Sequence, residues 1–123
     1  MKEDGAKTVN AMKPYLLTKE RMNKTERAYA DSLFALQLAG EILQYEFEGV
    51  KLRLAPGSFY TPDFYVVTPE RFELHEVKGF WREAAMVRIK VAAAKYPHFK
   101  FVVVTMDKPS RRSIVRWHFK EIN

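Results

Sequence analysis

The segment from residue 72 to residue 106 constrains the fold more than any other part of this chain. It holds a strand-like run at 72–78, a helix-like stretch at 81–96 that ends at Pro97, and a strongly apolar run at 99–106. Two strands joined through a helix are parallel neighbours in one sheet, and the crossover between them is normally right-handed. The last run has the composition of a central strand that is covered on both faces. The segment therefore predicts an α/β fold.

The first part of the chain predicts one helix followed by extended structure. A helix is expected at 24–39, where apolar residues follow its period. Asn23 can cap its start, and Gly40 can end it in a left-handed conformation. Residues 42–54 alternate as a strand does, and the alternation changes phase at 48–49. This change predicts a bulge or a tight turn.

Two further strands and their connections complete the expected sheet. The stretch 55–61 contains Pro-Gly and predicts a loop, 64–67 predicts a short strand, and 68–70 predicts a turn into the strand at 72–78. A last strand or short helix is expected at 114–119. The order of helix, three strands, helix and strand predicts a mixed central sheet flanked by helices.

The apolar pattern of the helix at 81–96 indicates how it is covered. Ile89 lies opposite a narrow arc of apolar residues, so we expect this helix to be covered on two sides. The arc consists of Phe80, Ala84, Val87, Val91 and Ala94.

Composition limits the domain organisation and the partners. The 123 residues suit one domain at 23–123, preceded by a basic and loosely ordered arm at 1–22. The absence of cysteine excludes disulfides and thiolate metal sites. A net charge of +6 favours polyanionic partners, with nucleic acid first among them. No apolar run approaches the roughly 20 residues of a membrane helix, and we expect a cytoplasmic protein.

Charged residues lie at the ends of two of the expected strands. Pro62-Asp63 precedes one strand, and Glu76-Val77-Lys78 ends the next. Residues two apart on a strand project to the same face, so Glu76 and Lys78 project together. A hairpin between the two strands would bring Asp63 beside Glu76. Two carboxylates next to an ammonium group are suited to metal-assisted phosphodiester hydrolysis.

Ordinary structural roles remain open for these residues. Asp63 could be a turn aspartate after proline. Glu76 and Lys78 could form a solvated strand face, although the same face carries Phe72 and Leu74, which we expect to be buried. A charge at the end of an apolar face needs a partner or a metal.

Glu26 and His75 each have a structural alternative to a role in the site. Glu26 completes an N-x-x-E capping box with Asn23, but the position also allows its carboxylate to point into the site. His75 alternates away from Glu76, and the three histidines lack the spacing of zinc ligands.

These motifs resemble those of the PD-(D/E)XK nuclease superfamily, whose core has the same αβββαβ order. Pro62-Asp63 and Glu76-Val77-Lys78 carry its signature. The chain is similar in particular to small phage-encoded nucleases, some of which are related to Holliday-junction resolvases. Three segments carry this closer likeness, namely 23–26, 60–64 and 75–82.

The resemblance implies a restriction-endonuclease-like core and a metal-dependent endodeoxyribonuclease. In the superfamily the aspartate and the glutamate bind Mg²⁺ or Mn²⁺, which assigns Asp63 and Glu76 as ligands together with the carbonyl of Val77. Lys78 matches the lysine that positions or activates the attacking water. Glu26 matches a glutamate of the first helix that often completes the site.

The resemblance also implies a DNA substrate with branches or junctions, cut by a homodimer during phage recombination or replication in the host cytoplasm. Basic residues would supply contacts to the DNA backbone, namely those of the arm, Lys51, Arg53, Arg82, Arg88, Lys90, Arg111, Arg112 and Arg116. Lys90, and as a second candidate Arg88, also matches a further polar residue that the helix after the third strand contributes to the site in this superfamily. A non-catalytic DNA-binding or assembly module on the same fold is the alternative. A small interaction protein with an accidental motif is a further one.

Overall fold

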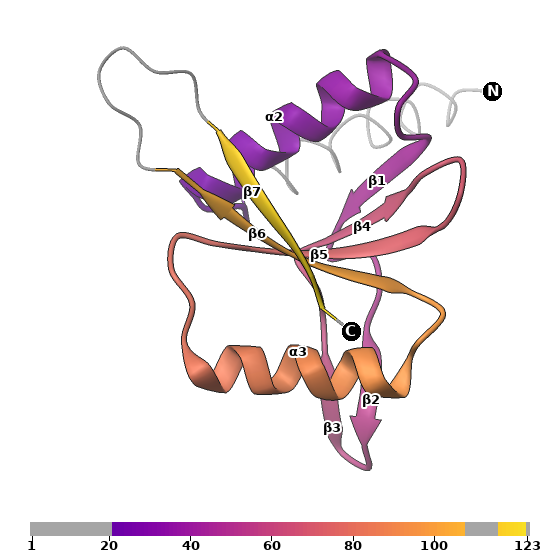
Figure 1. Ribbon diagram of the computed structural model, residues 1–123, viewed down its shortest axis with the longest axis vertical. Helices are drawn as coiled ribbons and strands as arrows, with labels where there is room; N and C mark the ends of the chain where they lie inside the picture. Colours follow the sequence, from indigo (N-terminus) through magenta and orange to yellow (C-terminus); the bar gives the residue numbers. More distant parts are fainter. Residues whose placement is uncertain (1–20, 108–115, 123) are drawn as a thin grey trace, which may run out of the picture.

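The computed structural model describes residues 21–107 and 116–122, which form two helices and two β-sheets (Figure 1). The helices are α2 (Lys24–Leu38) and α3 (Glu83–Lys95). The main sheet has the order β1-β4-β5-β6-β7 and contains β1 (Gln44–Phe47), β4 (Phe64–Val67), β5 (Phe72–Lys78), β6 (Lys100–Met106) and β7 (Trp117–Ile122). The second sheet is a hairpin of β2 (Leu52–Ala55) and β3 (Ser58–Tyr60). The structure is thus α/β with a mixed central sheet.

Strand order and direction confirm the expected crossover. β4 is antiparallel to both β1 and β5, with Phe64 opposite His75. β5 and β6 are parallel, and α3 connects them along the chain. β7 pairs with the other side of β6 in the antiparallel direction. β6 is therefore an interior strand, as its apolar sequence predicts.

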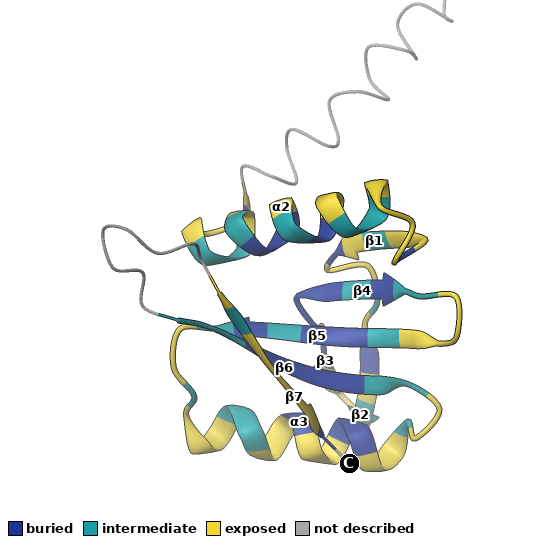
Figure 2. Ribbon diagram, turned by 45° about the horizontal axis from the view of Figure 1, so that its top comes forward, coloured by how far each residue is buried: buried dark blue, intermediate teal, exposed yellow. Residues whose placement is uncertain are grey.

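The two helices cover opposite faces of the sheet (Figure 2). Helix α2 packs through Tyr29 and Leu33 against a layer that includes Phe64. Helix α3 packs through Ile89 against the layer that includes Leu74. Because successive residues of a strand point to opposite faces, the interior strands β4, β5 and β6 supply side chains to both layers. Neither helix has the length and apolar character that crossing a membrane requires.

Local signals at the ends of α2 and in the β4–β5 hairpin are confirmed. Asn23 caps α2, because its side chain accepts a hydrogen bond of 2.8 Å from the N–H of Glu26. Gly40 follows the helix with a φ of 79°, a left-handed conformation that favours glycine. The turn between the strands is closed by Thr68, whose N–H donates to the carbonyl of Arg71.

The structure corrects the expectation for residues 42–61. Of the bulge or tight turn expected at 48–49, the structure has the turn: β1 ends at Phe47, and Glu48 turns the chain at a φ of 52°. Residues 42–54 are therefore not one strand, because β2 belongs to a different sheet. The expected loop at 55–61 is wrong for its second half, which forms β3. Gly57, at a φ of 75°, allows the tight turn that folds β3 back onto β2.

The expectation for the apolar arc of the second helix is also wrong. Phe80 is 69% exposed, Val87 55% and Val91 46%, so the arc faces solvent within the described part of the chain. Helix α3 is buried instead through Ile89 and its neighbouring alanines, whose small side chains allow close approach to the sheet. The expected burial of Phe72 is wrong as well, because this residue is 48% exposed and packs against other aromatic rings.

Two of the remaining expectations depend on the ends of the chain. The last element is a strand, β7, and not a short helix. Of the expected arm at 1–22, residues 1–20 lie outside the described residues. Arg21 is exposed and lies 3.5 Å from Glu48, and Met22 is buried in the core beside α2.

Candidate functional site

The carboxyl groups of Asp63 and Glu76 meet where β4 begins and β5 ends, as the sequence predicts. The antiparallel register of β4 and β5 places Asp63 opposite Glu76 when it is continued by one position beyond Phe64 and His75. The N–H of Asp63 donates a hydrogen bond of 3.2 Å to Oε1 of Glu76. The alternative of an ordinary turn aspartate is therefore not what the structure shows, because Asp63 is buried against the adjacent strand.

Glu76 is held from three directions. Its Oε1 also accepts a hydrogen bond of 2.8 Å from the hydroxyl of Tyr60, at the end of β3. Its Oε2 lies 3.5 Å from Nζ of Lys78. The side chain of Glu76 is 12% exposed and that of Lys78 is 42% exposed, so the ammonium group faces solvent while the carboxylate is largely enclosed.

Asp63 is held by the backbone of β5. Its Oδ2 accepts a hydrogen bond of 2.8 Å from the N–H of Val77. Burial raises the pKa of Asp63 to about 7, and the nearby charges of Glu76 and Glu26 act in the same direction. The hydrogen bond from Val77 opposes this shift. The carboxyl group of Asp63 therefore resists ionisation more than an exposed aspartate does.

The pKa values of Glu76 and Tyr60 are also raised. For Glu76 the cause is burial, which outweighs the hydrogen bond from Tyr60 and the charge of Lys78. For Tyr60 the causes are burial and the negative charge of Glu76, so the phenol keeps its proton and remains a donor. Two adjacent carboxyl groups that both resist ionisation form a site that a proton or a cation would stabilise.

Glu26 forms the capping box and also acts on the site. Its Oε1 accepts a hydrogen bond of 2.8 Å from the N–H of Asn23, which is the capping role expected from the sequence. Its charge nevertheless contributes to the raised pKa of Asp63, so the two carboxylates lie within electrostatic range. Within residues 21–107 and 116–122, no three side chains of His, Cys, Asp or Glu form a metal-binding group.

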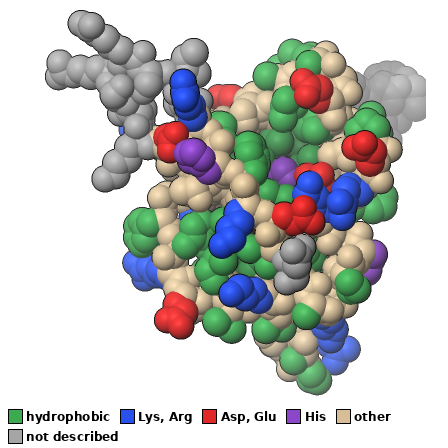
Figure 3. Space-filling view, viewed as in Figure 1, with side chains coloured by type: hydrophobic (Ala, Val, Ile, Leu, Met, Phe, Trp, Pro, Cys, Tyr) green, Lys and Arg blue, Asp and Glu red, His purple; other side chains and the backbone are tan. Residues whose placement is uncertain are grey.

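Basic residues of α3 and its N-terminal end lie near the site. The positive charge of Arg88 acts to lower the pKa of Tyr60, so the guanidinium lies within electrostatic range of the site. Arg82 lies over the ring of Phe80, 5.6 Å from its centroid. A pocket of about 350 Å³ beside Lys78 is lined by Phe80 and Arg82. On the face shown in Figure 3, basic side chains lie among exposed hydrophobic ones.

The other residues assigned to DNA contacts are placed only in part. Lys90 is exposed on α3. Arg111 and Arg112 lie outside the described residues.

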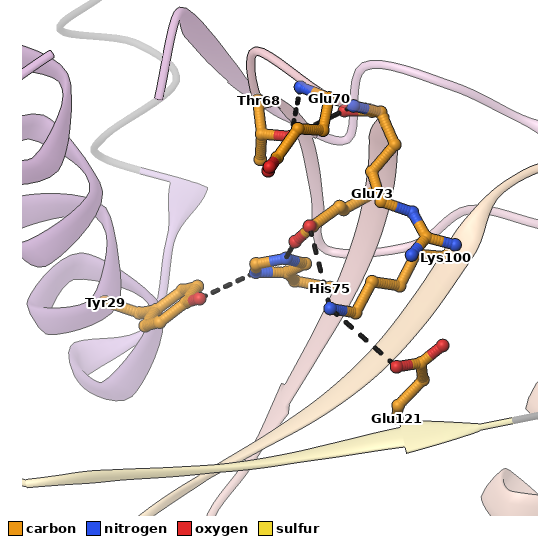
Figure 4. A network of polar contacts seen from close by, with 8 residues as sticks. Tyr29, Thr68, Glu70, Glu73, His75, Lys100 and Glu121 are labelled. Atoms are coloured by element: carbon orange, nitrogen blue, oxygen red, sulfur yellow. Dashed lines mark hydrogen bonds and ion pairs between the residues drawn. The ribbon is translucent and has the colours of Figure 1, made fainter. Parts of the chain in front are cut away.

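A second polar cluster lies on the opposite face of β5 (Figure 4). The ring of His75 lies between two partners, with Nδ1 2.6 Å from the hydroxyl of Tyr29 and Nε2 2.8 Å from Oε1 of Glu73. Lys100 continues the cluster, 3.9 Å from Glu73 and 3.8 Å from Glu121. His75 therefore points away from Glu76, as the alternation predicts, and links α2 to the sheet.

Sequence reasoning assigns no hydrogen-bonding role to Tyr60 or to Tyr29. Tyr60 reaches Glu76 from the end of β3, which pairs with β2, whereas the sequence pattern of this segment predicts a loop. The alternation of apolar and polar residues in this segment could have indicated the hairpin, since Leu52 and Tyr60 are opposite each other and both are buried.

Comparisons of the chain with models of protein families, with curated proteins and with solved structures found no match. The functional assignment therefore depends on the residues and their geometry.

Proposed function

We propose that this protein is a metal-dependent endonuclease that hydrolyses phosphodiester bonds in DNA. The observation that carries the proposal is the meeting of the buried carboxyl group of Asp63 with the largely enclosed one of Glu76, with the ammonium group of Lys78 3.5 Å from Glu76. Burial raises the pKa of both carboxyl groups, so their ionised forms are unfavourable. A bound divalent cation would stabilise these ionised forms.

The fold supports the same proposal. The strands β1, β4 and β5 are antiparallel neighbours, and α3 leads from β5 to the parallel strand β6. This arrangement agrees with the restriction-endonuclease-like core that the resemblance implies, with the β2–β3 hairpin inserted between its first two strands. We therefore propose that core as the finer description of the α/β fold.

The backbone at Pro62 and Val77 adds a third oxygen donor for the cation. The register of β4 and β5, continued by two positions, places Pro62 opposite Val77. In a strand, the N–H and C=O of one residue point to the same side, and the N–H of Val77 points to Asp63. Proline has no N–H to donate to the carbonyl of Val77. The proline of the motif thus keeps this carbonyl available on the side of the site.

The side chains fit a hard cation such as Mg²⁺ or Mn²⁺. The hydrogen bonds described above fall on Oδ2 of Asp63 and Oε1 of Glu76, so Oδ1 and Oε2 are the oxygens that would bind the metal, together with the carbonyl of Val77. Such an ion, when bound, polarises a phosphate and lowers the pKa of a coordinated water.

The remaining residues of the site orient the carboxylate of Glu76 and offset the negative charge of the phosphate. Tyr60 and the N–H of Asp63 hold one oxygen of Glu76, which directs the other towards Lys78. The solvent-facing ammonium group of Lys78 can approach a phosphate and stabilise the negative charge that develops on it. Arg82, Arg88 and Lys90 would contact the DNA backbone.

Cleavage assays test this function directly. Labelled Holliday junction, flap, single-stranded and duplex DNA would be incubated with the protein and Mg²⁺, Mn²⁺, Ca²⁺ or excess EDTA. We expect cutting with Mg²⁺ or Mn²⁺ only, and a decrease of at least about 100-fold in rate for Asp63→Ala, Glu76→Ala and Lys78→Ala, since each removes a group that acts in the transition state. Glu70→Ala, at the far end of the same strand pair, is the matched control.

Two results would contradict the proposal: undiminished cutting in EDTA, or near wild-type rates in folded variants of the three site residues. A non-catalytic DNA-binding module is the second candidate. It is favoured by the observation that, among the described residues, the metal site offers fewer than three clustered acidic or histidine side chains. Metal-independent binding of DNA without any product would support it.

A further inference from the structure

The β2–β3 hairpin is attached to the site at one end and projects past α3 at the other (Figure 1). Its last residue, Tyr60, donates the hydrogen bond to Glu76. The hairpin is a separate two-stranded sheet and adds no strand to the main sheet. Its position therefore brings an extra surface next to the candidate catalytic residues.

Contacts with α3 hold this hairpin in place. On its inner face, Leu52 and Tyr60 are buried in the same hydrophobic cluster as Ile89. The hydroxyl of Tyr96 donates a hydrogen bond of 2.7 Å to the carbonyl of Arg53, and Nζ of Lys95 donates one of 3.3 Å to that of Leu54. An isolated two-stranded hairpin is marginally stable, so these contacts are what fix its orientation.

The outer face of the hairpin combines an aromatic ring with cations. Arg53 and Phe59 are cross-strand neighbours. Nζ of Lys51 lies 4.7 Å from the centroid of the Phe59 ring, and Phe59 is 47% exposed. Lys51 and Arg53 are exposed, and residues 50–61 contain no Asp or Glu. A single exposed aromatic side chain is common on protein surfaces, but here two cations flank it on an element joined to the site.

We propose that the outer face of the β2–β3 hairpin binds an unpaired DNA strand beside the candidate active site. Phe59 stacks on a base, and Lys51 and Arg53 contact the phosphates on either side of it. A base can stack on an aromatic side chain only when the base is unpaired and exposed. The hairpin would therefore direct the enzyme to frayed or branched positions and away from continuous duplex. The inference rests on the proposed action on DNA and adds to it the structural feature of the DNA that is recognised.

Equilibrium binding tests the proposal without turnover. Labelled single-stranded, forked and blunt duplex DNA would be titrated with the protein in Ca²⁺. The variants are Phe59→Ala, Phe59→Trp and the double variant Lys51→Ala with Arg53→Ala. Phe72→Ala is the matched control, because Phe72 is 48% exposed, against 47% for Phe59, and lies at the opposite end of β5 from Lys78.

Each variant has a distinct expected result. Phe59→Ala should weaken binding of single-stranded and forked DNA by at least about fivefold and leave blunt duplex within about twofold. Phe59→Trp should keep the affinity of the wild-type protein, because an aromatic ring remains. The fluorescence of the introduced tryptophan should be quenched when single-stranded DNA binds. The double variant should lower the log–log salt slope for single strands by about 0.7 for each phosphate that is no longer neutralised.

The outcomes separate this inference from the proposed function. Equal affinities of folded Phe59→Ala and Phe72→Ala for forked DNA would overturn the role of the hairpin, whether or not the protein cuts DNA. Selective weakening of strand binding in Phe59→Ala would support the hairpin even if no Mg²⁺-dependent product formed. In that case only the endonuclease proposal would fail. Wild-type protein that binds none of the three DNAs would overturn both.

Discussion

At the scale of single residues, ionisation of the buried carboxyl group of Asp63 lowers the free energy of unfolding when no metal is bound. Burial and the neighbouring Glu76 raise its pKa from 3.8 to about 7. Below about pH 4 the group is protonated in the folded and the unfolded chain, and this effect is absent. Between about pH 4 and pH 7 only the unfolded chain ionises fully, so the free energy of unfolding falls as pH rises. Above this range the decrease is complete.

Asp63→Asn should remove this pH-dependent decrease in stability. The amide oxygen can still accept the hydrogen bond from Val77, but the side chain has no charge to bury. In EDTA at about pH 8 the variant should exceed wild type in stability by on the order of 2 kcal/mol, with little difference near pH 4. Urea unfolding at both pH values measures this, with Glu70→Gln as the exposed control. A variant less stable than wild type at the higher pH would show that the buried charge is already compensated without metal.

The meeting of Asp63 with Glu76 could be predicted because it depends on two local rules, the alternation of strand side chains and the register of a short hairpin. The hydrogen bond from Tyr60 to Glu76 could not be predicted in the same way. It depends on where the β2–β3 hairpin packs against α3, and that packing is set by contacts distant in sequence. The dual position of Glu26, in the cap and within range of Asp63, also needs the tertiary structure.

At the scale of the elements, the first turn of α2 contributes both to the stability of the helix and to the electrostatics of the site. Asn23→Ala removes the side chain that caps the helix and should lower the free energy of unfolding by about 1 kcal/mol. Glu26→Gln keeps an oxygen that can accept from the N–H of Asn23, so it should cost less than about 0.5 kcal/mol. The same change removes a negative charge that acts on Asp63, and we therefore expect weaker Mg²⁺ binding.

Chemical denaturation and calorimetric titration with Mg²⁺ distinguish these effects. Glu83→Gln, in the first turn of α3, is the matched control because Glu83 has a similar place in its own helix. Unchanged Mg²⁺ affinity in Glu26→Gln would limit Glu26 to its capping role. Weak Mg²⁺ binding in Asn23→Ala as well would show instead that the placement of the helix, and not the charge, controls the site.

The ends of the elements are easier to predict than their faces. Asn23 caps the start of α2 and Gly40 follows its end, and both can be recognised from a few neighbouring residues of the sequence. The prediction for the buried face of α3 is wrong, because valine and phenylalanine dominate an apolar arc while small alanines make the contact with the sheet. Side-chain hydrophobicity alone does not tell which of two apolar faces fits closely against its neighbour.

At the scale of the whole molecule, the net charge of +6 favours binding to DNA but does not say where the DNA lies. The described structure places Arg82, Arg88 and Lys90 on or beside α3; Arg82 shares a pocket with Lys78, and the charge of Arg88 acts on Tyr60. Arg71 is also exposed, but it lies in the turn before β5, at the far end of that strand from Lys78. The position of a cation, and not the total charge, should therefore decide its contribution to binding.

Salt titrations of duplex binding measure that contribution one residue at a time. Arg82→Ala, Arg88→Ala and Lys90→Ala should each lower the log–log slope by about 0.9 per phosphate left without its cation, because fewer counterions are released on binding. Arg71→Ala should leave the slope unchanged. The same measurement on Arg111→Ala with Arg112→Ala tests the two arginines that lie outside the described residues. If Arg71→Ala lowered the slope as much as the α3 variants do, binding would follow the net charge of the molecule, and the DNA would have no fixed place beside Asp63 and Glu76.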